Sequence, residues 1–288
     1  MRAALIVIFS GWYFAVAAQP VIGPLVNEFK TPFEVTHASV DRLGEFYLGG
    51  SGKLMRLDTE GRPAHQADLP GLALPGLLEC WNPLRIWYHD VSGAPHRAAI
   101  IDHSLSVSPD SVTIDPAVAI RPLMTAPAIL NSNCWVLDMD FSVKYLNLTT
   151  NTLMLETGPL VDPRTDPGFL FMRAYQNLLF LLTRDRGILV MNMTGKVIRT
   201  LPAEGAMHFG VLGEDIYFIR KDDLVFVNLY SGDQTEIKIP AVDRSATGIG
   251  RDRDVRTRKP VTLVVANDER LLIASGNTIR VYRFTPPN

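Results

Sequence analysis

The chain has 288 residues, of which 47% are hydrophobic, and its 28 Lys and Arg against 30 Asp and Glu leave a formal net charge of −2. This composition excludes a disordered chain and is sufficient for one large domain or two small ones. The balanced charge excludes a global attraction to nucleic acid or to an anionic membrane, and we expect no nucleic-acid partner. Two cysteines exclude a disulfide-rich scaffold and a four-cysteine zinc module, and we expect neither a cofactor nor a metal.

Residues 1–18 have the composition of a secretory signal peptide. Arg2 is their only charged residue, and the apolar stretch from Ala3 to Ala18 ends in small residues before Gln19. This stretch is too short to span a bilayer comfortably. We expect cleavage after Ala18, which predicts an exported protein, periplasmic or associated with the outer membrane, with no transmembrane segment after cleavage. The alternative is an uncleaved membrane anchor.

One strand-turn-strand unit recurs along residues 19–288, which we treat as a single domain. Each copy has an apolar run, a polar turn, a second apolar run, and then Asp or Asn, with Arg in the last copy. Six copies are present, and the one from Ile86 to Asp102 has a longer turn than the other five. Such runs between Gly, Asp, Asn and Ser indicate antiparallel strands joined by tight turns. In five copies the centre of the first run and the terminal position are 11 residues apart: Tyr47 and Asp58, Val136 and Asn147, Leu181 and Asn192, Tyr217 and Asn228, Leu272 and Arg283.

The spacing of the copies predicts a closed ring. Successive terminal positions are 44, 45, 45, 36 and 55 residues apart, close to the ~40–45 residues of a four-stranded propeller blade. We therefore predict an all-β fold, a six-bladed β-propeller. Because the chain ends soon after the third strand of the last unit, we expect an N-terminal strand, such as residues 26–33, to complete the last blade and close the ring. A pair of β-sandwiches is the alternative fold.

Several polar motifs are interpreted as turns. The recurring Asp or Asn is a turn-former at the end of the third strand rather than part of a ring of metal ligands. Gly49–Lys53 lacks the Ser or Thr that follows the lysine of a phosphate-binding loop, so it predicts a hairpin turn. Asp138–Ser142 starts like a calcium loop but lacks the glycine and glutamate that complete one, and it predicts a solvated turn.

Each of the two cysteines stands next to a tryptophan. We expect Cys80 and Cys134 to be separately buried thiols, because a free cysteine behaves as a small hydrophobic residue. One disulfide between them is the alternative in an oxidising compartment.

The chain resembles the exported six-bladed β-propeller proteins of the Bacteroidota. The resemblance is carried by the signal-like N-terminus, the length, and the blade cores Asn133–Leu137, Val143–Asn147 and Ile188–Asn192. It implies a periplasmic or surface-associated ring and provides no catalytic residues.

The stretch Val242–Val261 holds six basic residues against three acidic ones. In a propeller it leaves the ring on the same face as the first turn of every unit. A basic sector there fits an envelope protein or an anionic envelope component. The alternative is a solvated loop that its own Asp residues neutralise. The candidate binding residues are Arg184, Arg186, Arg220, Lys221, Arg251, Arg253, Arg256 and Arg258.

These features predict a non-enzymatic, exported protein-interaction or scaffold module of the bacterial envelope, since a scaffold is indicated and no catalytic constellation is. A small-molecule or glycan-binding propeller is one alternative, with Trp81 and Trp87 for stacking, although both are expected to pack in the core or between blades. The other is a hydrolase or lyase at the central channel, where the only close acid-histidine pairs come from His89, Asp90, Asp102 and His103.

Overall fold

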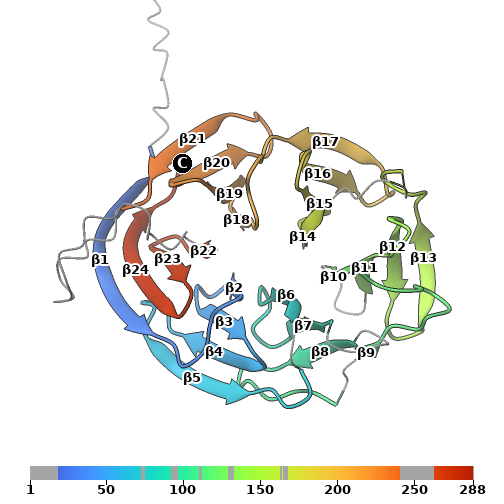
Figure 1. Cartoon of the computed structure of the whole chain (residues 1–288), viewed down its shortest axis with the longest axis horizontal. Helices are drawn as coiled ribbons and strands as arrows, with labels where there is room; N and C mark the ends of the chain where they lie inside the picture. Colours follow the sequence, from blue (N-terminus) through green and yellow to red (C-terminus); the bar gives the residue numbers. More distant parts are fainter. Residues whose placement is uncertain are drawn as a thin grey trace, which may run out of the picture.

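The structure is a computed structural model that describes residues 19–72, 75–91, 97–109, 112–128, 133–162, 164, 168–240 and 263–287. The expected signal peptide, 1–18, and the basic stretch 242–261 lie outside these residues. The described residues form six four-stranded antiparallel sheets arranged around a central axis (Figure 1). The predicted all-β, six-bladed β-propeller is confirmed.

The blades follow one another in sequence, and each begins with its innermost strand. Blade 1 comprises β2 (His37–Val40), β3 (Phe46–Gly50), β4 (Lys53–Leu57) and β5 (Pro63–Asp68). Blade 2 comprises β6 (Pro75–Glu79), β7 (Ile86–Asp90), β8 (Arg97–Ile101) and β9 (Val112–Thr113). Blade 3 comprises β10 (Met124–Pro127), β11 (Asn133–Leu137), β12 (Val143–Asn147) and β13 (Thr152–Glu156).

The second half of the ring has the same construction. Blade 4 comprises β14 (Phe169–Tyr175), β15 (Leu178–Thr183), β16 (Gly187–Asn192) and β17 (Val197–Leu201). Blade 5 comprises β18 (Gly210–Leu212), β19 (Asp215–Arg220), β20 (Asp223–Asn228) and β21 (Gln234–Lys238). Blade 6 comprises β22 (Leu263–Ala266), β23 (Arg270–Ser275), β24 (Thr278–Thr285) and the N-terminal strand β1 (Val21–Lys30).

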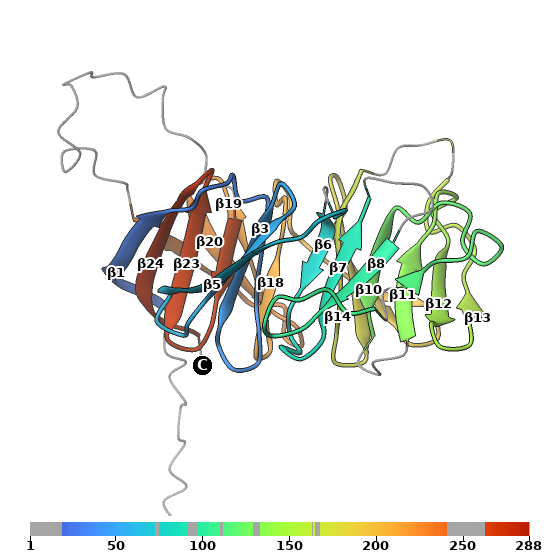
Figure 2. The same ribbon diagram turned by 90° about the horizontal axis from the view of Figure 1, so that it is seen from below.

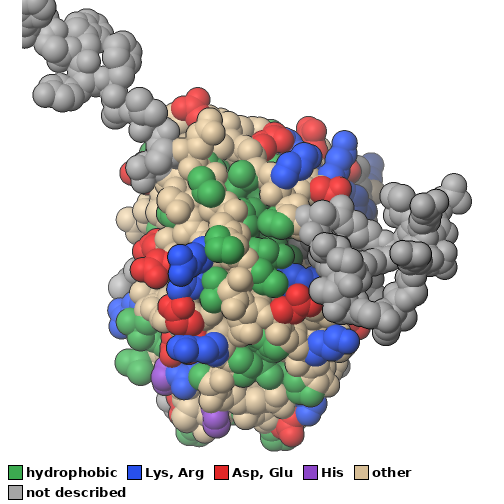
Figure 3. Space-filling model, turned by 90° about the vertical axis from the view of Figure 1, so that its left-hand side faces the viewer, with side chains coloured by type: hydrophobic (Ala, Val, Ile, Leu, Met, Phe, Trp, Pro, Cys, Tyr) green, Lys and Arg blue, Asp and Glu red, His purple; other side chains and the backbone are tan. Residues whose placement is uncertain are grey.

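The N-terminal strand closes the ring as predicted, but it starts earlier than residue 26. β1 pairs antiparallel with β24 from Val21 opposite Thr285 to Lys30 opposite Thr278. Strand pairing ends at Lys30 because the chain then turns inward, and Phe33 is buried in the core that blades 1 and 6 share. On its outer side, β1 exposes apolar residues such as Val21 and Leu25 among interspersed acidic and basic side chains (Figure 3).

The repeated apolar runs are the second strand of each blade, and the Asp or Asn follows or ends the third. Every residue of β3, β7 and β11 is buried, as periodic packing between neighbouring blades requires. The side-chain Oδ1 of the turn-forming residue accepts backbone N–H groups two to four residues ahead at 2.8–3.1 Å. The turn-former interpretation is confirmed at Asp58, Asp102, Asn147, Asn192 and Asn228.

Three other predictions have clear outcomes. Ser51 and Gly52, with φ of 51° and 69°, form the predicted hairpin turn between β3 and β4. Cys80 and Cys134 are free and buried, as expected. The Asp138–Ser142 segment is a turn, but the expectation that it is solvated is wrong for Asp138, whose side chain is 0% exposed. Asp138 is buried because it satisfies several backbone N–H groups and the Lys144 ammonium.

Antiparallel strands divide the connections between two faces of the ring. The turns between first and second strands lie at one face, which we call the inner-turn face. The turns between second and third strands lie at the opposite face, together with the ends at which one blade passes to the next. Figure 2 shows the ring edge-on with strand ends at both faces. Residues far apart in sequence therefore meet where the innermost strands reach the inner-turn face.

Candidate functional site

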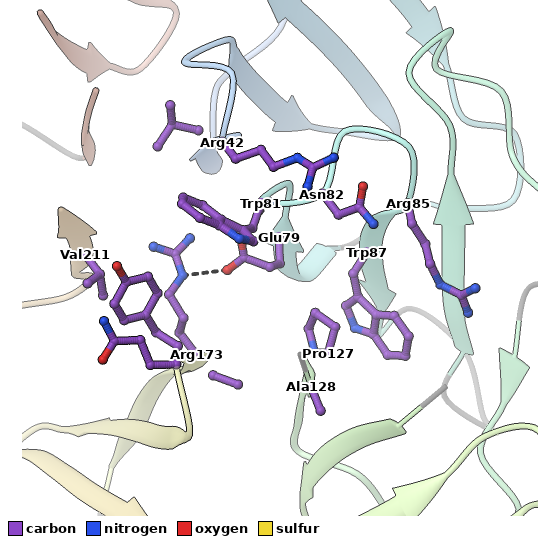
Figure 4. A pocket seen from close by; sticks show the side chains of 14 residues that line it. Arg42, Glu79, Trp81, Asn82, Arg85, Trp87, Pro127, Ala128, Arg173 and Val211 are labelled. Carbon is purple, nitrogen blue, oxygen red and sulfur yellow. Dashed lines mark hydrogen bonds and ion pairs between the residues drawn. The ribbon is translucent and has the colours of Figure 1, made fainter. Parts of the chain in front are cut away.

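A buried ion pair crosses the central channel near the inner-turn face. Arg173 on β14 donates from Nε to Glu79 Oε2 on β6 at 2.6 Å (Figure 4). The two strands belong to blades 4 and 2, and β10 of blade 3 stands between them in the ring. Both side chains are about nine-tenths buried. The pair therefore joins two non-adjacent blades inside the channel.

Neighbouring polar groups hold the Glu79 carboxylate. The Trp81 backbone N–H donates to Glu79 Oε1 at 3.1 Å, and the Ser39 hydroxyl on β2 lies 3.5 Å from the same oxygen. Ser39 Oγ in turn accepts the Cys80 N–H at 3.1 Å. These contacts couple the Glu79 carboxylate to the start of the β6–β7 turn. They set the direction in which the chain leaves β6.

A cavity of about 470 Å³ opens over this ion pair. Its lining comes from the inner-turn ends of blades 1 to 5. Trp81 is 53% exposed, and its ring meets the Tyr175 ring edge-on with centroids 6.1 Å apart. The lining residues that matter below are Arg42, Glu79, Trp81, Arg85, Arg173 and Tyr175.

Hydrogen bonds hold the aromatic walls of the cavity in place. The Tyr175 hydroxyl donates to the Gly213 carbonyl at 3.1 Å, and the Arg42 N–H donates to the Trp81 carbonyl at 3.2 Å. Trp87, which also lines the cavity, is only 2% exposed and donates its indole N–H to Thr125 Oγ1 at 3.1 Å. The expectation of core packing is thus confirmed for Trp87. It is wrong for Trp81, because the β6–β7 turn carries that ring into the cavity.

Two further arginines line the cavity without a counter-charge. Arg42 comes from the β2–β3 turn and Arg85 from the end of the β6–β7 turn. Figure 4 shows the Arg42 side chain extending past Trp81 toward Asn82, and Arg85 beside Trp87. Within the described part of the chain, neither guanidinium forms an ion pair. The cavity therefore combines exposed aromatic surface with uncompensated positive charge.

A second cavity, of about 500 Å³, adjoins the first on the same face. The two share Arg42, Trp81 and Tyr175, so this aromatic pair stands between them. The far wall of the second cavity comes from the β22–β23 turn and includes Asp268 and Glu269, both exposed. The mouth of the channel is therefore a two-part cleft whose parts carry opposite charge.

Histidines occupy the channel toward the other face. Burial lowers the pKa of His37, at the start of β2, to about 4, although a hydrogen bond with the Gly76 backbone opposes the shift. Burial, together with the charge of Arg173, places the pKa of His208 well below its usual value. The His208 ring packs on Phe171 with centroids 4.2 Å apart. Both histidines are therefore neutral at pH 7, and Arg173 is the nearby cation.

The predicted basic residues lie at the face opposite the cleft. Arg184 and Arg186 belong to the β15–β16 turn, and Arg220 and Lys221 to the β19–β20 turn. Arg220 pairs with Glu236, which neutralises one of the four charges. The other four candidates, Arg251, Arg253, Arg256 and Arg258, lie outside the described residues.

The residues named for a channel enzyme do not converge. His89 and Asp90 are buried in β7, and Asp102 uses its carboxylate in the turn after β8. His103 lies between blades, where its Nε2 is 2.8 Å from Glu45 Oε2 of blade 1. None of the four lines either cavity.

Two further features were sought among the described residues, a metal site and a membrane-spanning helix. Among them, no three His, Cys, Asp or Glu side chains are grouped closely enough to hold a metal ion. The same residues include no helix with the length and apolar composition needed to cross a membrane.

Sequence reasoning missed five of these lining residues, namely Arg42, Glu79, Arg85, Arg173 and Tyr175. The available signal was a charged residue in an otherwise apolar innermost strand, as in Pro75–Glu79 and Phe169–Tyr175. A charge at the ring axis needs a partner across the channel, but the sequence does not show which blade supplies it.

Comparisons with known proteins support the fold and assign no function. No protein-family model matches the chain, and no curated protein matches it. Among solved structures, the chain is similar to one described as a streptogramin B lyase, with a TM-score of 0.55 and 13% sequence identity over 93% of this chain and 88% of that chain. At this identity the similarity supports the propeller fold alone.

Proposed function

We propose that this propeller binds a small ligand in the cavity that contains Trp81. The observation that carries the proposal is the placement of a half-exposed tryptophan inside a concave site, above a buried Glu79–Arg173 pair. Ligand sites are typically clefts of roughly 300–1,000 Å³ with apolar walls and a few oriented polar groups. The cavity, at about 470 Å³, has this size and composition.

The site is rigid in the way that recognition requires. The Trp81 backbone is held by Glu79 and Arg42, and the Tyr175 hydroxyl is held by Gly213. Aromatic rings held in place lose little conformational entropy when a flat ligand packs against them. A flat ligand that packs against Trp81 would remove from water the half of this ring that is exposed.

Two parts of the proposal rest on sequence rather than on the cavity. We retain export to the periplasm or outer membrane because of the composition of residues 1–18, together with the resemblance to exported Bacteroidota propellers. A scaffold role is the second candidate function, because Arg186 and Lys221 are exposed on the opposite face and form no ion pair with a described residue. An anionic envelope component or an envelope protein is the partner that these charges fit.

Replacing Trp81 by alanine tests the ligand-binding proposal. A thermal-shift screen of small aromatic carboxylates, amides and amines identifies ligands of the wild-type protein, and calorimetry measures their affinity. We expect W81A to weaken the binding of these ligands about tenfold or more, because a central aromatic contact is removed. Its free energy of unfolding should fall by only about 1–2 kcal/mol, since the side chain is half exposed and loses part of its burial together with the edge-on contact to Tyr175.

The matched control is I198A on the outer strand β17. Ile198 is 52% exposed, close to the exposure of Trp81, and it is remote from the channel. This variant should bind like wild type. Equal affinity of wild type and W81A for every ligand in the screen would contradict the proposal.

A further inference from the structure

We propose that the ligand carries an oxyanion, a carboxylate or a phosphate or sulfate ester, attached to a flat apolar group. This inference rests on the proposed function and adds the chemical class of the ligand. The oxyanion would lie in the cavity that Arg42, Arg85 and Arg173 line, and the flat group would pack against Trp81.

The charge of the cavity lining favours an anion. Three arginines and one glutamate line the cavity. Glu79 neutralises Arg173 through their ion pair, whereas Arg42 and Arg85 have no carboxylate partner among the described residues. Two positive charges are therefore uncompensated at one concave surface. Guanidinium groups bind carboxylates and phosphates through charge-assisted hydrogen bonds, which are stronger than neutral ones.

One nitrogen of the Arg173 guanidinium, Nη1, is available to bind a ligand. A guanidinium has five N–H donors, and this one donates from Nε to Glu79, while its Nη2 lies 3.5 Å from Ser39 Oγ. Nη1 has no hydrogen bond to a described residue. Arg173 is about nine-tenths buried at the cavity floor, so a ligand oxygen that reaches Nη1 would gain a partly desolvated hydrogen bond.

The adjoining cavity determines where the anionic group lies. Asp268 forms no ion pair with a described residue, and Glu269 Oε2 is 3.7 Å from Arg270 Nη1. Asp41 uses its carboxylate to accept the Leu43 and Glu45 N–H groups. The acidic wall disfavours a second anionic group on that side of Trp81. The ligand is therefore anionic at one end and neutral or cationic at the other.

Three molecules of one shape test the inference. Phenylacetate, phenylacetamide and phenethylamine share a phenyl group and differ mainly in charge. Calorimetric or ligand-observed NMR titrations with each, at low ionic strength, measure the preference. We expect phenylacetate to bind about tenfold tighter than phenylacetamide, and phenethylamine to bind most weakly. Phenyl phosphate and inorganic phosphate are two further probes, which separate an ester with an aromatic group from the free ion.

Charge-removing variants identify the groups responsible. The double variant R42S/R85S should lose most of the preference for phenylacetate over phenylacetamide, because it removes the two uncompensated charges. R283S is the control, since Arg283 is exposed on β24 and forms no ion pair with a described residue. This variant should retain the full preference. In the wild type, added salt should reduce the preference for phenylacetate, because salt screens exposed charges.

The outcomes separate this inference from the proposed function. If phenylacetate and phenylacetamide bind the wild type equally and W81A abolishes the binding of both, the anion inference is overturned. The proposal that the cavity binds a ligand would still stand. A preference that survives unchanged in R42S/R85S would also overturn it. If none of the probes binds at millimolar concentration, the anion inference fails, and the thermal-shift screen with W81A then decides the proposed function separately.

Discussion

Replacement of Arg173 by methionine is expected to lower the free energy of unfolding by about 3–5 kcal/mol, the usual cost of removing one partner of a buried ion pair. Methionine would leave the Glu79 carboxylate about nine-tenths buried, with the Trp81 N–H and the Ser39 hydroxyl as its remaining partners among the described residues. It would also remove the side chain that joins blades 2 and 4 across the channel. Urea-induced unfolding measures the change.

A second substitution separates charge from packing. E79Q in the R173M background keeps an acceptor for the Trp81 N–H and removes the unpaired charge. We expect this double variant to recover at least half of the lost stability. R283M, an exposed residue on β24, serves as the control and should unfold like wild type. If R173M lowers the free energy of unfolding by less than about 1 kcal/mol, water in the channel solvates Glu79 and the ion pair does not stabilise the fold.

Asp138→Asn is expected to cost about 3 kcal/mol, because the carboxylate has four hydrogen bonds from charged or backbone donors. Its oxygens accept the N–H groups of Ile120, Arg121 and Met139 at 2.8–2.9 Å and the Lys144 ammonium at 2.7 Å. The asparagine amide has one acceptor fewer and no charge. Thermal and urea unfolding measure the loss.

The same carboxylate makes stability depend on pH. Burial alone would raise the pKa of Asp138, but the hydrogen bonds from Lys144 and the three backbone groups outweigh it and hold the pKa below its ordinary value. A carboxylate with a lowered folded-state pKa contributes stability above its unfolded-state pKa of about 4. That contribution is lost as the pH falls through the folded-state pKa.

The stability difference between wild type and D138N should therefore be constant near neutral pH and shrink below about pH 4. Asp140 in the same turn provides the matched control, since among the described residues it accepts only from Ser142, at 2.9 Å to its N–H and 2.7 Å to its hydroxyl. D140N should cost well under half as much. An unchanged difference between wild type and D138N down to pH 3 would contradict the assignment.

The ring itself follows from local chemistry that the sequence displays. Asp58, Asn147 and Asn192 end third strands because their short side chains accept N–H groups of the following turn, which depends on residues within four positions. Apolar runs such as Trp135–Leu137 are buried on both sides because blades pack face to face. The missing fourth strand of blade 6 is predictable for the same reason, since an apolar third strand cannot end a sheet unpaired.

The cleft depends on contacts that no local pattern encodes. Trp81 and Trp87 are six positions apart and equally apolar, yet one enters the cavity and the other packs between blades, because the β6–β7 turn reverses the chain between them. Glu79 and Arg173 are 94 residues apart and meet only because the ring closes around one axis. The sequence alone thus determined the blades and their number, through short-range turn and strand chemistry. The tertiary structure alone decided which side chains meet across the channel, because that depends on ring closure.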